Sequence, residues 1–266
     1  MVVVDGSRFL WRKRLVFFPT EQQVEEILAG ISCNEIVSVR QCARPLARTS
    51  GRIDQEVFGT SWLDLRKDLE ALYAEMDSKS CRYEIRKAEK LRERIRVSRN
   101  DSTTREDFLR LYNRFVELHG HTRRLSRRRL EDYCKTSDIW VLYLGGRPMA
   151  GHLLVRDVAN RRVRLIFSAT ARLNSKQEAG VCGALNRLLH WEEMQAYKAE
   201  GMETYDFGGI GDGTSSVARF KLSFGGQKVE EYSYVFAGPI SAPCYRAYLW
   251  LGPAARTTST LVHRIF

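Results

Sequence analysis

The sequence Tyr205-Asp206-Phe207-Gly208-Gly209-Ile210, followed by Ala218-Arg219-Phe220-Lys221-Leu222-Ser223-Phe224-Gly225-Gly226, decides the fold that we expect of this chain. A short apolar strand ends at an acid and two glycines, and a polar loop then leads to an aromatic–lysine pair. Glycines at a strand end allow positive φ angles and the close approach of a ligand. In the plain alternative, the glycines form only a tight turn and Asp206 caps the next helix.

An acid and a lysine close to such a strand end could act on an amine and stabilise negative charge. Asp206 could orient or deprotonate the amine, and Lys221 could neutralise a developing oxyanion or a phosphate. Arg219 precedes Lys221 by two residues and would share its face on a strand-like path. We therefore take Asp206 and Lys221 as candidate catalytic residues and Arg219 as a candidate donor-binding residue.

The order of these residues resembles the C-terminal signature of the Fem-type peptidoglycan-bridge aminoacyltransferases, a branch of the GNAT acyltransferase superfamily. The resemblance is strongest over residues 201–230, extends to 62–98 and is weak before residue 60. It implies an α/β, GNAT-like acyltransferase fold, with a mixed central sheet, flanking helices and a reduced N-terminal half. It also implies that Lys221 corresponds to the lysine that neutralises charge in the Fem-type enzymes.

The hydrophobic periodicity agrees with this order of elements. It predicts a helix through 62–88, a helix after Thr104, a shorter helix after Ser126, a meander at 139–144, 149–155 and 163–168, a long helix over 178–200, a strand at 204–207, a short helix across 215–222 and a strand at 228–236. We expect an N-terminal reduced half over 1–100, an acyltransferase domain over 101–240 and a tail over 241–266.

Composition narrows the partners and the compartment. The 266 residues carry a net charge of +11, which favours an anionic partner: a nucleotide-bearing donor, an acidic carrier protein, RNA or a membrane surface. The six cysteines are dispersed without a CxxC motif, which argues against a zinc site and a disulfide scaffold. No apolar run is long enough to span a bilayer. We expect a cytoplasmic protein without a metal, with peripheral membrane contact as an alternative for the aromatic tail.

The acyl-donor end is expected before the long helix. The resemblance implies a loop of pattern Q/R-x-x-G-x-G/A there, whose backbone N–H groups hold the pyrophosphate of coenzyme A at a helix N-terminus. Gln177 and Gly180 match this pattern, while Cys182 departs from it and Gly183 follows one residue later. Alternatively, the two glycines only let the helix pack closely on the sheet.

Two further donor-side residues are candidates. Backbone N–H groups near Ser168, at the end of the third meander strand, could polarise the carbonyl. Glu178 is a spare base.

The acceptor end is expected around the turn between the first two helices of the domain, which the resemblance places over the acceptor. We assign His119, His121, Arg123 and Tyr205 to acceptor binding, because the histidines could carry protons near neutral pH and the arginine could grip phosphates. Alternatively, His119 caps the helix C-terminus, and the run Arg123–Arg129 is a solvated face.

Together these features predict an N-acyltransferase. It would move an acyl group from an acyl thioester, either acyl-CoA or an acyl carrier protein, to an amino group, for example of a nucleotide-linked amino sugar or another cell-envelope precursor. Fem-type relatives instead take the acyl group from an aminoacyl-tRNA, and we keep this as the enzymatic alternative. A non-catalytic, anion-binding GNAT-like module is the alternative from another class.

Overall fold

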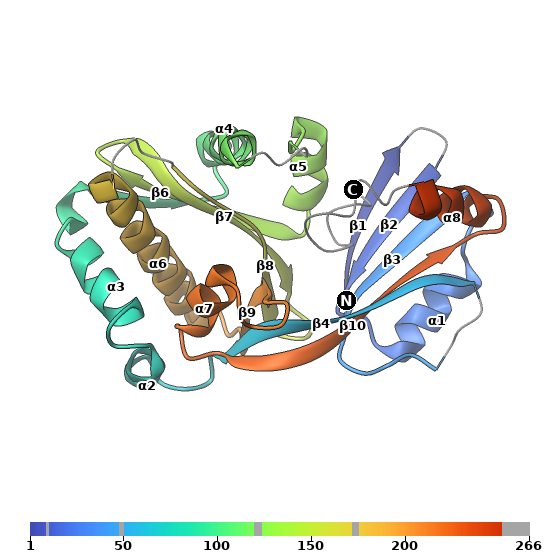
Figure 1. Ribbon diagram of the computed structural model, residues 1–266, viewed down its shortest axis with the longest axis horizontal. Helices are drawn as coiled ribbons and strands as arrows, with labels where there is room; N and C mark the ends of the chain where they lie inside the picture. Colours follow the sequence, from blue (N-terminus) through green and yellow to red (C-terminus); the bar gives the residue numbers. More distant parts are fainter. Residues whose placement is uncertain (9–10, 48–50, 120–123, 172–175, 252–266) are drawn as a thin grey trace. The chain divides into compact units, whose positions relative to one another are not determined.

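The computed structural model describes residues 1–8, 11–47, 51–119, 124–171 and 176–251 (Figure 1). Contacts between residues divide the chain into two compact units. The first comprises Met1–Phe58 together with the residues from Glu230 onward, and the second comprises Gly59–Val229. The two units are defined by packing alone. The domain bounds expected from the sequence, 1–100, 101–240 and 241–266, therefore stay a prediction.

The first unit is built on a four-stranded part of the sheet. Its strands are β1 (Val2–Arg8), β2 (Trp11–Phe17), β3 (Glu35–Cys42) and β10 (Gln227–Ala237). The β1–β2 and β3–β10 pairs are antiparallel, and β2 runs parallel to β3. A parallel neighbour needs a crossover, and α1 (Glu21–Ala29) supplies it.

The described helices of the first unit are α1 and α8. Thr20 caps α1, and Gln23 completes the capping box. The second helix, α8, spans Ser241–Leu251. Buried valines and aromatic residues of α1, β2, β3 and β10 form the core of the unit.

The second unit contains the meander that the sequence predicts. Its strands are β4 (Arg52–Asp64) from Gly59 onward, β5 (Ile95–Arg99), β6 (Ser137–Leu144), β7 (Arg147–Asp157), β8 (Arg162–Thr170) and β9 (Thr204–Gly209). In space they follow the order β4-β9-β8-β7-β6-β5. Only the β8–β9 pair is parallel in this series, so the sheet is mixed, as expected.

Helices cover both faces of this sheet (Figure 1). On one face lie α4 (Ser102–Leu118) and α5 (Arg127–Cys134), and on the other lie α3 (Cys81–Glu89) and α6 (Lys176–Ala199). The shorter elements are α2 (Leu69–Glu75), the 3-10 turn Arg92–Arg94 and α7 (Ser216–Leu222). None of the described helices is both long enough and apolar enough to cross a bilayer.

Two local predictions were wrong, and tertiary contacts explain both. The helix expected over 62–88 is divided: Trp62, Leu63 and Asp64 end strand β4 and pair with β9, and the rest of the range holds α2 and α3. Pairing with a neighbouring strand overrides the helical spacing of the leucines. The cap of α4 is Asp101 rather than Thr104: its Oδ1 accepts from the Thr104 backbone N–H at 2.7 Å.

The glycine pair at the end of β9 gives a matched test of this fold. Gly208 has φ +76°, and a Cβ there would lie 2.9 Å from the Leu165 carbonyl oxygen. Gly208→Ala should therefore reduce the free energy of unfolding by about 1–3 kcal/mol. Gly209→Ala is the control, because Gly209 is exposed and a Cβ there meets nothing within 4 Å. Urea denaturation followed by circular dichroism measures both, and equal losses would contradict the assigned backbone.

Candidate functional site

The sheet of the second unit opens between β8 and β9. β8 pairs with β7 along its whole length to Thr170. With β9, the pairs found among the described residues run only from Arg162 to Arg164. Beyond Arg164 no further β8–β9 pair is found in the described part of the chain, so backbone groups on this edge of β8 can bond an extended ligand.

Asp206 lies at the last β8–β9 pair and is completely buried. Its Oδ2 is ion-paired with both Arg162 and Arg164. Its Oδ1 accepts from the Thr60 hydroxyl at 2.5 Å and from the Gly208 backbone N–H at 2.8 Å. One carboxylate therefore joins β4, β8 and β9 at the point where the sheet opens.

The environment of Asp206 argues against its expected role as a base. Burial raises the pKa of its carboxyl, but the charges of Arg164 and Arg162 outweigh this effect and lower the pKa to about 2. A carboxylate that is so weakly basic and so fully bonded is a poor acceptor for the proton of an amine. We correct its expected role: Asp206 holds the two arginines.

Lys221 reaches the same strand end from α7. Ser215 caps this helix, and the Lys221 Nζ donates to the Gly209 carbonyl oxygen at 2.8 Å. A Cβ on Gly208 would lie 3.6 Å from this Nζ and 3.9 Å from the Arg164 Nη2. Burial and the Arg164 charge lower the pKa of Lys221 to about 8, and Asp206 opposes them. Asp206 and Lys221 therefore meet at one strand end.

The expected donor-binding residues are dispersed. Ser168 lies half-buried on the diverging part of β8, whereas Arg219 is exposed on α7. Arg219 does not share a face with Lys221, because residues two apart on a helix lie about 200° apart around its axis. Around Gly180 and Gly183 of α6 a Cβ would meet only side-chain ends, those of Lys87 at 3.6 Å and Arg187 at 3.8 Å. The side chain of Gln177 lies outside the described residues.

The expected acceptor-binding residues do not form a cluster among the described residues. His119 ends α4, where its Nδ1 lies 2.8 Å from the Phe115 carbonyl oxygen and its ring packs on Phe115. This is the capping alternative. His121 and Arg123 lie outside the described residues. Tyr205 is completely buried, so its assignment to acceptor binding is wrong: its side chain belongs to the core.

Tyr205 belongs to a buried polar chain beneath the opening. Its hydroxyl donates to the Glu193 Oε2 at 2.5 Å, and the His190 Nδ1 lies 2.8 Å from that hydroxyl. The His152 Nδ1 lies 2.7 Å from the Glu193 Oε1. Burial and the nearby His152 lower the pKa of His190 to about 3. These three contacts are hydrogen bonds, and His152, His190 and Glu193 also lie close enough together to hold a metal ion, with the His190 Nδ1 3.4 Å from the Glu193 Oε2.

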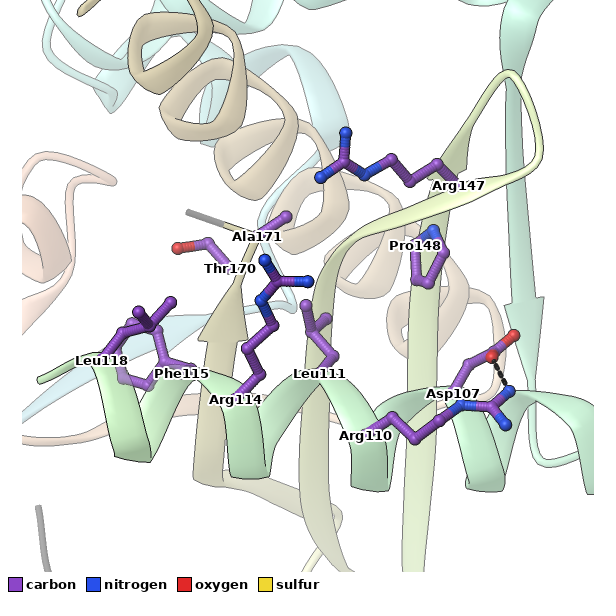
Figure 2. A pocket seen from close by; sticks show the side chains of 10 residues that line it. All are labelled: Asp107, Arg110, Leu111, Arg114, Phe115, Leu118, Arg147, Pro148, Thr170 and Ala171. Atoms are coloured by element: carbon purple, nitrogen blue, oxygen red, sulfur yellow. Dashed lines mark hydrogen bonds and ion pairs between the residues drawn. The ribbon is translucent and has the colours of Figure 1, made fainter. Parts of the chain in front are cut away.

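A pocket opens on the α4 face, at the end of β8 (Figure 2). Its cavity volume is about 220 Å³. Ten residues of α4, β7 and the end of β8 line it: Asp107, Arg110, Leu111, Arg114, Phe115, Leu118, Arg147, Pro148, Thr170 and Ala171. Three arginines thus surround a partly apolar hollow beside the free end of β8.

Sequence reasoning missed most partners of the predicted residues. Arg162 and Arg164 alternate along a strand next to one that carries an acid, a spacing that signals a buried ion pair. His190 and Glu193 are three residues apart on a helix, which places them on one face. No sequence pattern links Arg114 with Arg147, because only the packing of α4 on β7 brings them close together.

Residues 78–222 match the family model described as "Acetyltransferase (GNAT) domain". The chain belongs to this GNAT family. It is a transferase enzyme with the expected GNAT-like fold, and GNAT domains generally bind acyl-CoA. A search of curated proteins gave no match.

Solved structures share this fold at low sequence identity. FemX matches with a TM-score of 0.63 and 12% identity over 92% of this chain and 85% of its own. The C-terminal domain of a lysylphosphatidylglycerol synthetase from Agrobacterium fabrum matches with a TM-score of 0.58 and 13% identity over 94% and 85%. L-PGS from Bacillus licheniformis gives 0.55 and 11% over 93% and 84%. The GNAT protein therefore shares the fold of FemX and of the lysylphosphatidylglycerol synthetase domain.

Removal of the buried charge at the opening tests its structural role. Asp206→Asn leaves Arg162 and Arg164 without their counter-charge, which should cost about 3–5 kcal/mol of unfolding free energy. Asp64→Asn breaks the exposed pair with Arg66 and should cost at most about 1 kcal/mol. Urea denaturation at pH 7 measures both variants. Similar losses would show that the pair at Asp206 does not hold the sheet.

The lowered pKa of Asp206 also predicts how the free energy of unfolding depends on pH. Its folded-state pKa of about 2 lies below its ordinary value of 3.8, so its stabilising effect is complete above pH 3.8. The effect should be lost as the pH falls from 3.8 through about 2. The difference in unfolding free energy between the natural protein and Asp206→Asn should therefore shrink over this interval. A difference independent of pH would contradict the assignment.

Proposed function

We propose that this GNAT enzyme is an N-acyltransferase that moves an acyl group from an acyl thioester to an amino group at the opening between β8 and β9. The observation that carries the proposal is the position of Lys221, whose ammonium lies at the strand end where β8 and β9 part. The free edge of β8, including Ser168, would bond the extended arm of the donor. Coenzyme A or an acyl carrier protein would supply this arm.

The reaction needs a neutral amine, a fixed carbonyl and a stabilised oxyanion. The amine nitrogen attacks the thioester carbon, so that a C–N bond forms and the carbonyl electrons move to oxygen. Lys221 would donate a hydrogen bond to this oxyanion, which in enzymes of this kind contributes about 10²–10³ in rate. The carbonyl then re-forms, the C–S bond breaks, and the proton lost by the amine balances the charge of the departing thiolate.

The buried ion pairs would hold Lys221 and the strand end in position. Their three residues, Asp206, Arg162 and Arg164, would not contact the substrate. The two arginines are held by one buried carboxylate, so their charges are partly neutralised. The remaining positive potential keeps the pKa of Lys221 near neutral pH, together with its burial. A proton donor with a pKa near the working pH is well suited to stabilise the oxyanion.

A second candidate is aminoacyl transfer from an aminoacyl-tRNA to a cell-envelope precursor. The similarity in fold to FemX and to the lysylphosphatidylglycerol synthetase domain, over nine-tenths of this chain, favours keeping it. Native mass spectrometry against coenzyme A thioesters and tRNA would separate the two donors. Loss of donor crosslinking after ribonuclease treatment would favour the tRNA donor. Binding of neither would contradict both proposed donors.

Substitution of Lys221 tests the proposed site. Lys221→Met should lower kcat for release of coenzyme A from an acyl-CoA by about 10²-fold, because the oxyanion loses its donor. Donor affinity, measured by equilibrium binding, should change little. Lys228→Met is the control, because this exposed lysine only lies 3.4 Å from the Asp212 carbonyl oxygen. Unchanged turnover in Lys221→Met would overturn the assignment.

The pH profile supplies an independent test. Lys221 has a lowered pKa of about 8, so its charge is present below that pH and is lost as the pH rises through it. The rate should therefore decline above about pH 8. Lys221→Arg keeps the charge at every accessible pH and should remove this decline. A decline that persists in the arginine variant would have to arise from another group.

A further inference from the structure

The arginine-lined pocket on the α4 face has no place in the transfer step described above. It is formed by α4, by the start of β7 and by the end of β8 (Figure 2). Thr170 ends β8, and Ala171 follows it. Both residues line the pocket, and they come after the stretch of β8 for which no pair with β9 is found among the described residues. The pocket therefore adjoins the strand edge to which we assign the donor.

Positive charge in the pocket is in excess and is not compensated. Of the three arginines, Arg110 is ion-paired with Asp107 at 2.5 Å, and Asp107 also accepts from the Tyr143 hydroxyl at 2.9 Å. Within the described parts of the chain, the guanidinium groups of Arg114 and Arg147 have no hydrogen-bond or ion-pair partner. Figure 2 shows both guanidinium groups turned toward the hollow. Three arginines against one aspartate leave two positive charges.

The rest of the lining is apolar. Leu111, Phe115 and Pro148 form part of the wall, and Leu118 at the rim is 44% exposed. A guanidinium group binds phosphate or carboxylate through two parallel hydrogen bonds, and such bonds gain strength beside apolar walls. The lining thus suits an anion attached to an apolar portion.

Size excludes a whole cofactor. A cavity of about 220 Å³ is smaller than the about 300–1,000 Å³ typical of sites for drug-sized ligands. Coenzyme A is larger than such ligands. The pocket therefore holds one functional group of a substrate rather than the complete donor.

We propose that this pocket binds an anionic group, phosphate or carboxylate, with its adjoining apolar portion, on the acyl acceptor, and that Arg114 and Arg147 grip the anion. The assignment to the acceptor rests on the proposed function. The anion site itself does not, because binding can be measured without turnover.

Phenyl phosphate is the probe for the site. Calorimetric titration of the full chain in 50 mM salt should show phenyl phosphate binding more tightly than inorganic phosphate, and benzyl alcohol not binding. Arg114→Ala and Arg147→Ala should each weaken phenyl phosphate about 10-fold, the loss expected for hydrogen bonds to a charged group. Both side chains are exposed, so the variants should keep the unfolding transition of the natural protein.

The matched control is Arg86→Ala. Arg86 is an exposed arginine of α3, on the opposite face of the sheet, and its removal should leave the affinity unchanged. Equal losses in all three variants would mean unspecific attraction to a basic protein and would overturn the site. Benzyl alcohol binding as tightly as phenyl phosphate would overturn the anion specificity.

Competition separates the acceptor from the donor. Coenzyme A should not displace phenyl phosphate, and displacement would place the arginines in the donor site and overturn the proposal. In an acylation assay, Arg147→Ala should raise KM for anionic acceptors while kcat and the donor KM stay unchanged. Probe binding that depends on both arginines in an enzyme inactive with every thioester would refute the proposed reaction but keep the anion site.

Discussion

The buried ion pairs of Asp206 with Arg162 and Arg164 are the constraint on which the rest of this structure depends. Charges removed from water are tolerated only when they are paired with opposite charge, and Asp206 supplies that charge to both arginines. Thr60 and the Gly208 backbone N–H complete the bonds of the carboxylate. Because these partners come from β4, β8 and β9, the ion pairs fix the register of three strands at one point.

The same point is where the sheet opens. The last β8–β9 pair among the described residues is at Arg164, so the strongest constraint lies at the edge of the proposed site. A rigid strand end of this kind can hold Lys221 against the Gly209 carbonyl while leaving the free edge of β8 to a donor. Stability and the proposed chemistry therefore depend on the same few side chains. The ion pairs and hydrogen bonds of Asp206 suit it to structural support.

Part of the site could be predicted from local sequence and part could not. The glycine pair of β9 indicated a strand that ends near a ligand, and Lys221 does lie at that strand end. Residue type alone suggested that Asp206 takes a proton and that Tyr205 contacts an acceptor. Burial reverses both expectations, because it surrounds the acid with two cations and places the tyrosine in the core with His190 and Glu193.

The sequence by itself determined the order of elements from α4 to β10, the glycine-bounded strand end and the GNAT character of the chain, because periodicity and turn residues act over a few neighbours. Only the tertiary structure decided which charges meet. Arg162 and Asp206 are far apart in the chain, as are Arg114 and Arg147, and strand pairing and helix packing bring each pair together. Charges interact according to their distance and burial in space, which a linear pattern does not contain.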